Sequence, residues 1–104
     1  MMGDFSGLLK ATGRDNDPDT RRAATTAIGG VDAAEPRTRE ALRAALRDGD
    51  FQVVVAAAGA IRQRKDKEFL PALRDLKANP PASAAGATWF AGMIDGIVAE
   101  LTKM

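Results

Sequence analysis

The sequence contains no cysteine, no histidine and no tyrosine. Without cysteine the chain can form neither a disulfide nor a thiolate metal site, and it fits a reducing compartment, so we expect a cytoplasmic protein. Without histidine, and with serine only at Ser6 and Ser83, no Ser-His-Asp or Cys-His arrangement can be assembled. We therefore expect no catalytic residue and no cofactor, and we predict that the chain is not an enzyme.

The sequence also lacks an excess of one charge and a long apolar run. Its 15 basic and 14 acidic residues give a net charge of +1, so no field would gather nucleic acid or an anionic membrane onto the whole surface. No stretch approaches the roughly 20 apolar residues that cross a bilayer. We expect residues 1–104 to form one domain, whose small core would benefit from self-association.

What the sequence does contain is an internal repeat. Residues 14–28 align with residues 47–61 at a constant offset of 33, and residues 41–43 align with residues 72–74 at an offset of 31. Such a period fits two helices joined by tight turns. The repeat predicts an all-α fold, a right-handed α-solenoid of about three helical hairpins.

Capping residues mark the ends of the expected helices. Asp17 is placed as the N-cap of a helix whose first residue is Pro18. Asp50 and Asp66 are placed as the N-caps of later helices. The Gly29-Gly30 pair predicts a helix end. The six expected helices cover residues 4–13, 18–29, 36–48, 51–64, 67–78 and 84–102. They group into repeats over residues 4–30, 36–64 and 67–102.

The repeated residues resemble a known family. Segments 14–24 (RDNDPDTRRAA), 47–50 (RDGD) and 69–73 (FLPAL) are similar to the bacterial HEAT-like repeats named for phycobilisome lyases. The resemblance covers nearly the whole chain and implies a scaffold, a subunit of a lyase-type complex or a regulatory module. The third repeat is degenerate, because residues 80–84 (PPASA) lack the Asp-Pro cap. Val54 also stands where the first repeat has Arg21.

Three aspartates have the alternating spacing that opens a calcium loop. These are Asp15, Asp17 and Asp19, but Thr20 and Thr26 occupy the positions where such a loop needs glycine and glutamate. The mismatch favours a turn between helices with an N-cap, and we expect no metal site.

Arginines on the second helix of each hairpin are the candidate partner-binding residues. That helix usually lines the concave face of such stacks, which selects Arg21, Arg22 and Arg62. For Arg21 an alternative stays open, an ion pair with an aspartate of a neighbouring turn within the chain.

Two basic groups suggest nucleic-acid binding as an alternative function. Arg39, Arg43 and Arg47 recur every fourth residue and share one helix face. The second group is Arg62, Arg64, Lys65 and Lys67. No aromatic residues are interleaved with them and the net charge is small, so we favour a solvated face and do not expect a nucleic-acid partner.

The last helix is apolar nearly all round. Its bulky residues cover about half of the helix surface. They are Trp89, Phe90, Met93, Ile94, Ile97, Val98 and Leu101. The small residues Ala85, Gly92, Gly96 and Ala99 form a second stripe. A terminal repeat normally keeps a polar outer face, so we expect the bulky residues to mediate self-association, giving a homodimer. The alternatives are that they close the core of a monomer, or that a further repeat would cover them.

Taken together, these features predict a non-catalytic module for protein–protein interaction or scaffolding. The alternatives are a nucleic-acid-binding module that uses the arginine groups and a non-catalytic subunit of a lyase-type complex.

Overall fold

The computed structural model describes residues 7, 10–13, 16–30, 36–84 and 86–103. Within these residues there are five α-helices, two short 3₁₀ helices and no strand, so the predicted all-α class is confirmed. The α-helices are α2 (Pro18–Ile28), α3 (Pro36–Ala45), α4 (Phe51–Arg64), α5 (Leu70–Ala78) and α6 (Thr88–Lys103). The 3₁₀ helices are η1 (Lys67–Phe69) and η2 (Ala82–Ala84). Half of the first predicted helix, residues 4–6, 8 and 9 of 4–13, lies outside the described residues.

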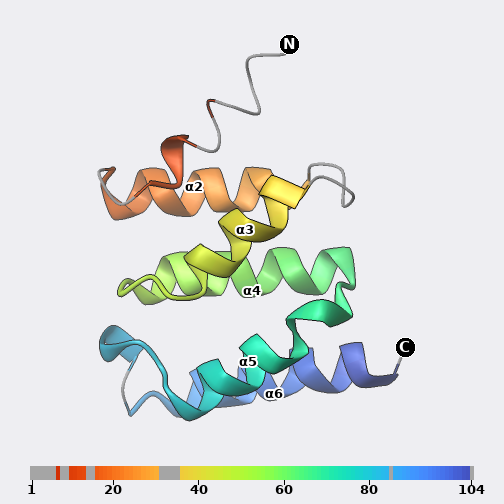
Figure 1. Cartoon of the computed structure of the whole chain (residues 1–104). Coiled ribbons are helices and arrows are strands. Elements are labelled where there is room, and N and C mark those ends of the chain that lie inside the picture. Colours follow the sequence, from red (N-terminus) through yellow and green to blue (C-terminus); the bar gives the residue numbers. More distant parts are fainter. Residues whose placement is uncertain (1–6, 8–9, 14–15, 31–35, 85, 104) are drawn as a thin grey trace.

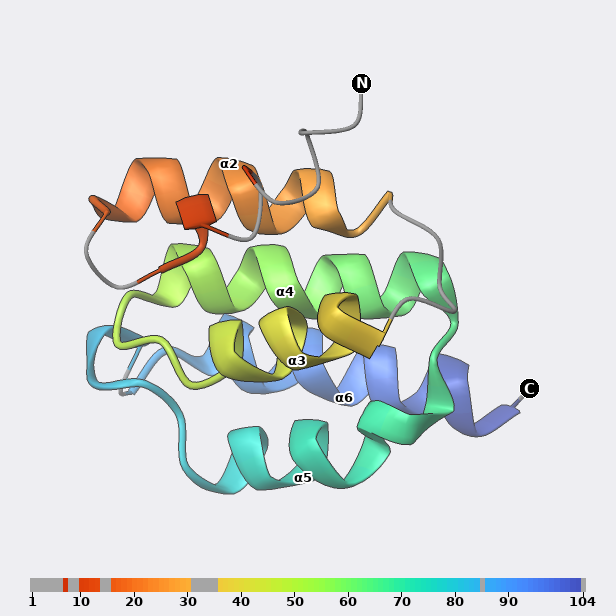
Figure 2. The ribbon, with the colours of Figure 1, turned by 45° about the horizontal axis from the view of Figure 1, so that its top comes forward.

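The helices form two layers. Helices α2, α4 and α6 lie side by side in one layer, and α3 and α5 cover it (Figures 1 and 2). The helices of the first layer run in the same direction. At the start of α4 the Phe51 ring lies 5.6 Å from that of Trp89 at the start of α6, and near the end of α4 Arg62 faces Glu100. We call the exposed side of α2, α4 and α6 the inner face, and the exposed side of α3 and α5 the outer face.

The predicted N-caps are confirmed. The Asp17 carboxylate accepts a hydrogen bond from the Thr20 amide, and Pro18 is the first residue of α2. The Asp50 carboxylate accepts from the amide of Gln52, and α4 then covers residues 51–64 as predicted. The Asp66 carboxylate accepts from the Glu68 amide and begins η1. Each carboxylate satisfies a backbone donor that has no partner within its own helix.

Three predicted boundaries differ from the structure by three residues or more, and the ends of α2 and α6 differ by one. Helix α3 ends at Ala45 and not at residue 48, because the chain tightens into a turn that buries Asp48. The segment 67–78 begins as the 3₁₀ helix η1 before α5 starts. The last α-helix begins at Thr88 and not at residue 84, because Gly86 adopts φ +82°, which ends the helical path from η2.

One hydrophobic cluster joins the two layers. Its fully buried members come from every α-helix of the described region. They include Ile28, Leu42, Val54, Ile61, Phe69, Leu73, Phe90, Ile94 and Leu101. Gly29, the first of the two glycines after α2, also serves packing, because a Cβ there would lie 2.5 Å from the Ala60 Cβ. The absence of a side chain at Gly29 therefore sets the closest approach of α2 to α4.

None of the helices in the described part of the chain is both long and apolar enough to span a membrane.

Candidate functional site

Arg21 is committed to a contact within the chain. Its Nε donates to one Asp48 carboxylate oxygen at 2.8 Å, and its Nη2 donates to the other at 3.1 Å. The Arg21 Nη1 donates a hydrogen bond to the Asn16 carbonyl oxygen. The Asp48 carboxylate raises the pKa of Arg21 above its usual range, because it stabilises the charged guanidinium. The intramolecular pair left open by the sequence is thus present, and Arg21 would have to break it to contact a partner.

Arg22 and Arg62 have exposed side chains on the inner face. Arg62 lies 3.6 Å from Glu100, and the two side chains are 59% and 61% exposed. A pair as exposed as this contributes little to stability, since water and salt screen it. Arg62 can therefore exchange Glu100 for a carboxylate of a partner at small cost.

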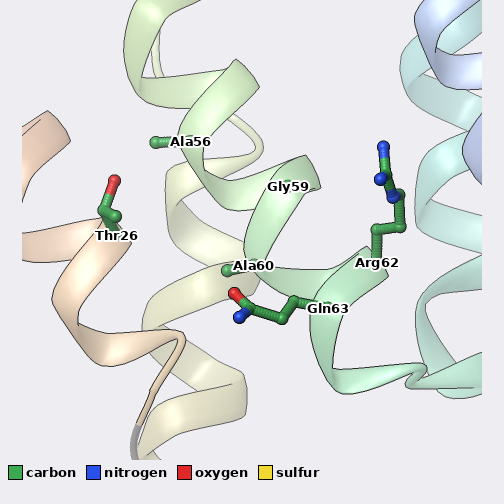
Figure 3. A pocket seen from close by; sticks show the side chains of 6 residues that line it. All are labelled: Thr26, Ala56, Gly59, Ala60, Arg62 and Gln63. Atoms are coloured by element: carbon green, nitrogen blue, oxygen red, sulfur yellow. The ribbon is translucent and has the colours of Figure 1, made fainter.

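A shallow groove of about 530 Å³ runs between α2 and α4 beside Arg62. Figure 3 shows its lining, with Gly59 at the centre of the α4 wall and Thr26 opposite on α2. The remaining lining residues are Ala56, Ala60, Arg62 and Gln63. Gly59 is exposed, and a Cβ added there would have no atom within 4 Å. The groove thus combines a floor with almost no side chains and a rim with amide, hydroxyl and guanidinium groups.

The bulky residues of α6 divide between core and surface. Phe90, Ile94, Ile97 and Leu101 are buried in the chain's own core. Met93 and Val98 are half-buried, whereas Trp89 is 52% exposed. Four of the seven residues expected to mediate self-association are therefore engaged within the chain.

Trp89 is anchored in an aromatic group on the inner face. Its ring meets the rings of Phe51 and Phe90 edge-on, with centroids 5.6 and 5.8 Å apart. Edge-to-face contacts of this kind restrain the indole while leaving one side of it open to solvent. Gly92 and Gly96 are exposed on the same helix. Ala85, the first member of the predicted small-residue stripe, lies outside the described residues.

Two members of the first basic group contact other side chains of the chain. Arg39 donates to Asp66 at 2.9 Å and lies 3.2 Å from Glu68, and the Asp66 carboxylate raises the pKa of Arg39. The Arg43 guanidinium carbon lies 5.4 Å from the centroid of the Phe69 ring. Arg62, in contrast, projects from the inner face (Figure 3).

Of the three aspartates that have calcium-loop spacing, Asp17 is the N-cap of α2. The Asp17 carboxylate accepts from the Thr20 hydroxyl at 2.6 Å, which lowers the pKa of Asp17. Asp15 lies outside the described residues. Among the described residues, no group of three or more acidic, histidine or cysteine side chains is arranged to hold a metal ion.

The sequence analysis left open an aspartate partner for Arg21 without naming Asp48, and it did not find the partner of Arg39, although a signal was available. Both arginines pair with an aspartate 27 residues later, and both aspartates lie in a turn before a helix. The groove residues Thr26 and Gln63 were also missed. Neither belongs to a motif, and only the packing of α2 against α4 brings them together.

Stacked two-helix units joined by short turns define this chain as a helical-repeat protein. Residues 5–89 match the family model for HEAT repeats, so the chain belongs to the HEAT-repeat family. The matched region ends at the second residue of α6. No curated protein and no solved structure matches the chain. HEAT repeats are in general non-catalytic modules that bind proteins.

Proposed function

We propose that this chain is a non-catalytic protein-interaction module, a short α-solenoid that binds a protein partner on its inner face. The observation that carries the proposal is the groove between α2 and α4. Its exposed Gly59 lets a partner's backbone approach closely, and the polar groups of Thr26, Gln63 and Arg62 surround that approach. A partner segment with a carboxylate would replace Glu100 at Arg62.

The exposure of the side chains decides which residues we assign to partner binding. Arg22 and Arg62 are exposed and are the candidates on this face. Arg21 supports the face indirectly, because its pair with Asp48 joins α2 to the turn before α4. A role as the non-catalytic subunit of a lyase-type complex, which the phycobilisome-lyase resemblance implies, is a narrower form of the same proposal. A cytoplasmic location is consistent with the lack of cysteine.

Site-specific photocrosslinking in the native host tests the inner face. A photoreactive amino acid replaces Gln63 at the groove rim in one variant and Arg74 on the outer face in the control. The proposal expects a discrete crosslinked protein from position 63 that position 74 does not give. Equal yields of that same protein from both positions, or its crosslinking at position 74 alone, would contradict the proposal.

Self-association through α6 is a second candidate, which the exposure of Trp89 favours. An indole that is 52% exposed and held by Phe51 is a suitable anchor for a second copy. Met93, next to Trp89 on the helix surface, would extend the contact, whereas Phe90, Ile94, Ile97 and Leu101 would support it from the core and Val98 lies on the opposite side of α6. Light scattering coupled to size exclusion should then show a homodimer at micromolar concentration and a monomer for Trp89→Ala. A monomeric wild-type chain would exclude this candidate and leave the groove proposal intact.

A further inference from the structure

The outer face has its own groove, separate from the one between α2 and α4. It lies between α3 and α5 and has a volume of about 490 Å³. On the α5 side Ala72, Asp75, Leu76 and Asn79 line it, at the spacing of one helix face. Arg43, Leu46, Arg47 and Pro71 complete the lining.

The floor of this outer groove is apolar. Leu46 and Leu76 reach it from the core and are 5% and 6% exposed, Ala72 is half-buried, and Pro71 is exposed at its edge. Such a floor can accept an aliphatic side chain, whereas a phosphate backbone would gain nothing from it.

The α3 wall of the outer groove is basic. Helix α3 contains three arginines and one acidic residue, and Arg47 follows it. Arg43 and Arg47 are one helical turn apart, and neither forms an ion pair within the described residues. The Phe69 ring orients the Arg43 guanidinium from below, at 5.4 Å.

The single carboxylate on the opposite wall is partly satisfied. Asp75 accepts a hydrogen bond from the Asn79 side-chain amide at 3.2 Å. The two unpaired arginines therefore determine the charge that the outer groove prefers, and that charge is negative.

We propose that the outer groove binds an acidic amphipathic helix of a partner protein. Two carboxylates one turn apart on the partner would meet Arg43 and Arg47, whose spacing along α3 they match. A leucine on the adjacent position of the same partner helix would enter the floor between Leu46 and Leu76. The outer groove and the inner-face groove lie on opposite layers of the fold. Binding at the outer groove can therefore be tested independently of the function proposed above.

The probe is a fluorescein-labelled helical peptide of about fourteen residues, with glutamates four residues apart beside leucines at helical spacing. Binding is measured by fluorescence anisotropy and located by amide chemical-shift changes in NMR spectra of the whole chain. We expect saturable binding with shifts confined to the outer groove. Replacing the glutamates of the peptide by glutamine should weaken binding by about tenfold or more, since both charge contacts are lost.

Three variants of the chain carry the decisive comparison. Arg47→Glu reverses one wall charge, and Pro71→Glu adds a negative charge at the rim in the first turn of α5, where a helix tolerates it. Arg74→Glu is the matched control, because it makes the same charge change on exposed α5 surface outside the lining. We expect the first two to weaken binding by about tenfold or more and the control by less than about twofold. Thermal melts confirm that each variant is folded.

Several results would overturn the proposal. Equal loss in Arg47→Glu and Arg74→Glu would mean attraction by net charge alone. Equal affinity of the glutamine peptide would remove the arginines from recognition. A short duplex DNA that binds more tightly than the peptide, and loses affinity in Arg47→Glu, would assign the surface to nucleic acid. Absence of saturable peptide binding up to about 1 mM would also reject it.

Discussion

Arg21 and Asp48, 27 residues apart in the sequence, join the beginnings of α2 and α4 through two hydrogen bonds of 2.8 and 3.1 Å. Arg39 and Asp66, also 27 residues apart, join α3 to the turn that precedes η1 and α5. Each layer of the fold therefore has its own arginine–aspartate pair between successive helices. The Arg21 pair is the more enclosed one, with side chains 12% and 3% exposed against 37% and 7% for the Arg39 pair.

Removal of Asp48 should destabilise the chain strongly. Asp48→Ala leaves the Arg21 guanidinium enclosed without its carboxylate and also removes an acceptor for the Asp50 amide. Breaking an enclosed pair in this way should lower the free energy of unfolding by about 3 kcal/mol. Urea unfolding followed by circular dichroism measures the loss.

The double variant Arg21→Met/Asp48→Leu is the control for that loss. It removes both charges together and should recover most of the stability, because an apolar pair of similar size has no enclosed charge to satisfy. A double variant as unstable as Asp48→Ala would show that the ion pair itself was not the cause.

The contact between Gly29 and Ala60 predicts opposite effects for two glycine substitutions. Gly29→Ala would place a methyl 2.5 Å from the Ala60 Cβ and should lower the free energy of unfolding by about 2 kcal/mol, because α2 must move away from α4. Gly59→Ala meets open space within a helix and should raise it by about 0.5–1 kcal/mol. Thermal unfolding of both variants and of the wild-type chain measures the two changes. Destabilisation of the same size in both would contradict the packing argument.

Thr38 should be more stable as valine. Its hydroxyl oxygen is buried and has no hydrogen-bond partner among the described residues, so a methyl of the same shape removes a desolvation cost. Thr38→Val should raise the free energy of unfolding by about 1 kcal/mol. The control is Thr25→Val, since the Thr25 hydroxyl is also buried but donates to the Arg21 carbonyl at 2.7 Å. A larger gain in the control would refute the reasoning.

The cap of α2 should weaken in acid. The Thr20 hydroxyl lowers the pKa of Asp17 in the folded chain, so the carboxylate favours folding above its unfolded pKa of about 3.9. That contribution is lost as the pH falls through the lower, folded pKa. At neutral pH the melting temperature of the wild-type chain should therefore be higher than that of the Asp17→Asn variant. The difference between the two melting temperatures should shrink below about pH 3.9.

Asparagine retains the cap geometry at position 17, so the comparison isolates the charge. A melting series from neutral pH to about pH 2 measures it. If Asp19→Asn shows the same pH-dependent difference, net charge and not the Thr20 contact is responsible.

Local signals in the sequence were sufficient to predict most of the helices. The boundaries of α4 were predicted correctly because Asp50 caps the helix through its own neighbours. The end of α3 was not, because the turn at Asp48 is stabilised by Arg21 of the preceding helix. The helix propensity of the residues around Asp48 does not depend on a partner so distant in the sequence.

The exposure of two candidate residues was predictable from the sequence, but the detail of the candidate site was not. The sequence placed Arg22 and Arg62 on second helices, where the structure exposes them. It could not separate Trp89 from Phe90, since both lie on one wide apolar arc and only packing against α4 and α5 decides which is buried. The outer groove forms where residues of α3 and of the turn after it lie beside α5, an arrangement that the linear sequence does not reveal.

The common direction of α2, α4 and α6 has an electrostatic consequence. Their amino-terminal ends meet at one edge, where three macrodipoles of like orientation concentrate partial positive charge, while α3 and α5 point the other way. Asp17, Asp48 and Asp50 stand at that same edge. Asp17 and Asp50 place negative charge at the dipole ends of α2 and α4, while the charge of Asp48 is already paired with Arg21, so the acidic turns of this chain serve its own helices.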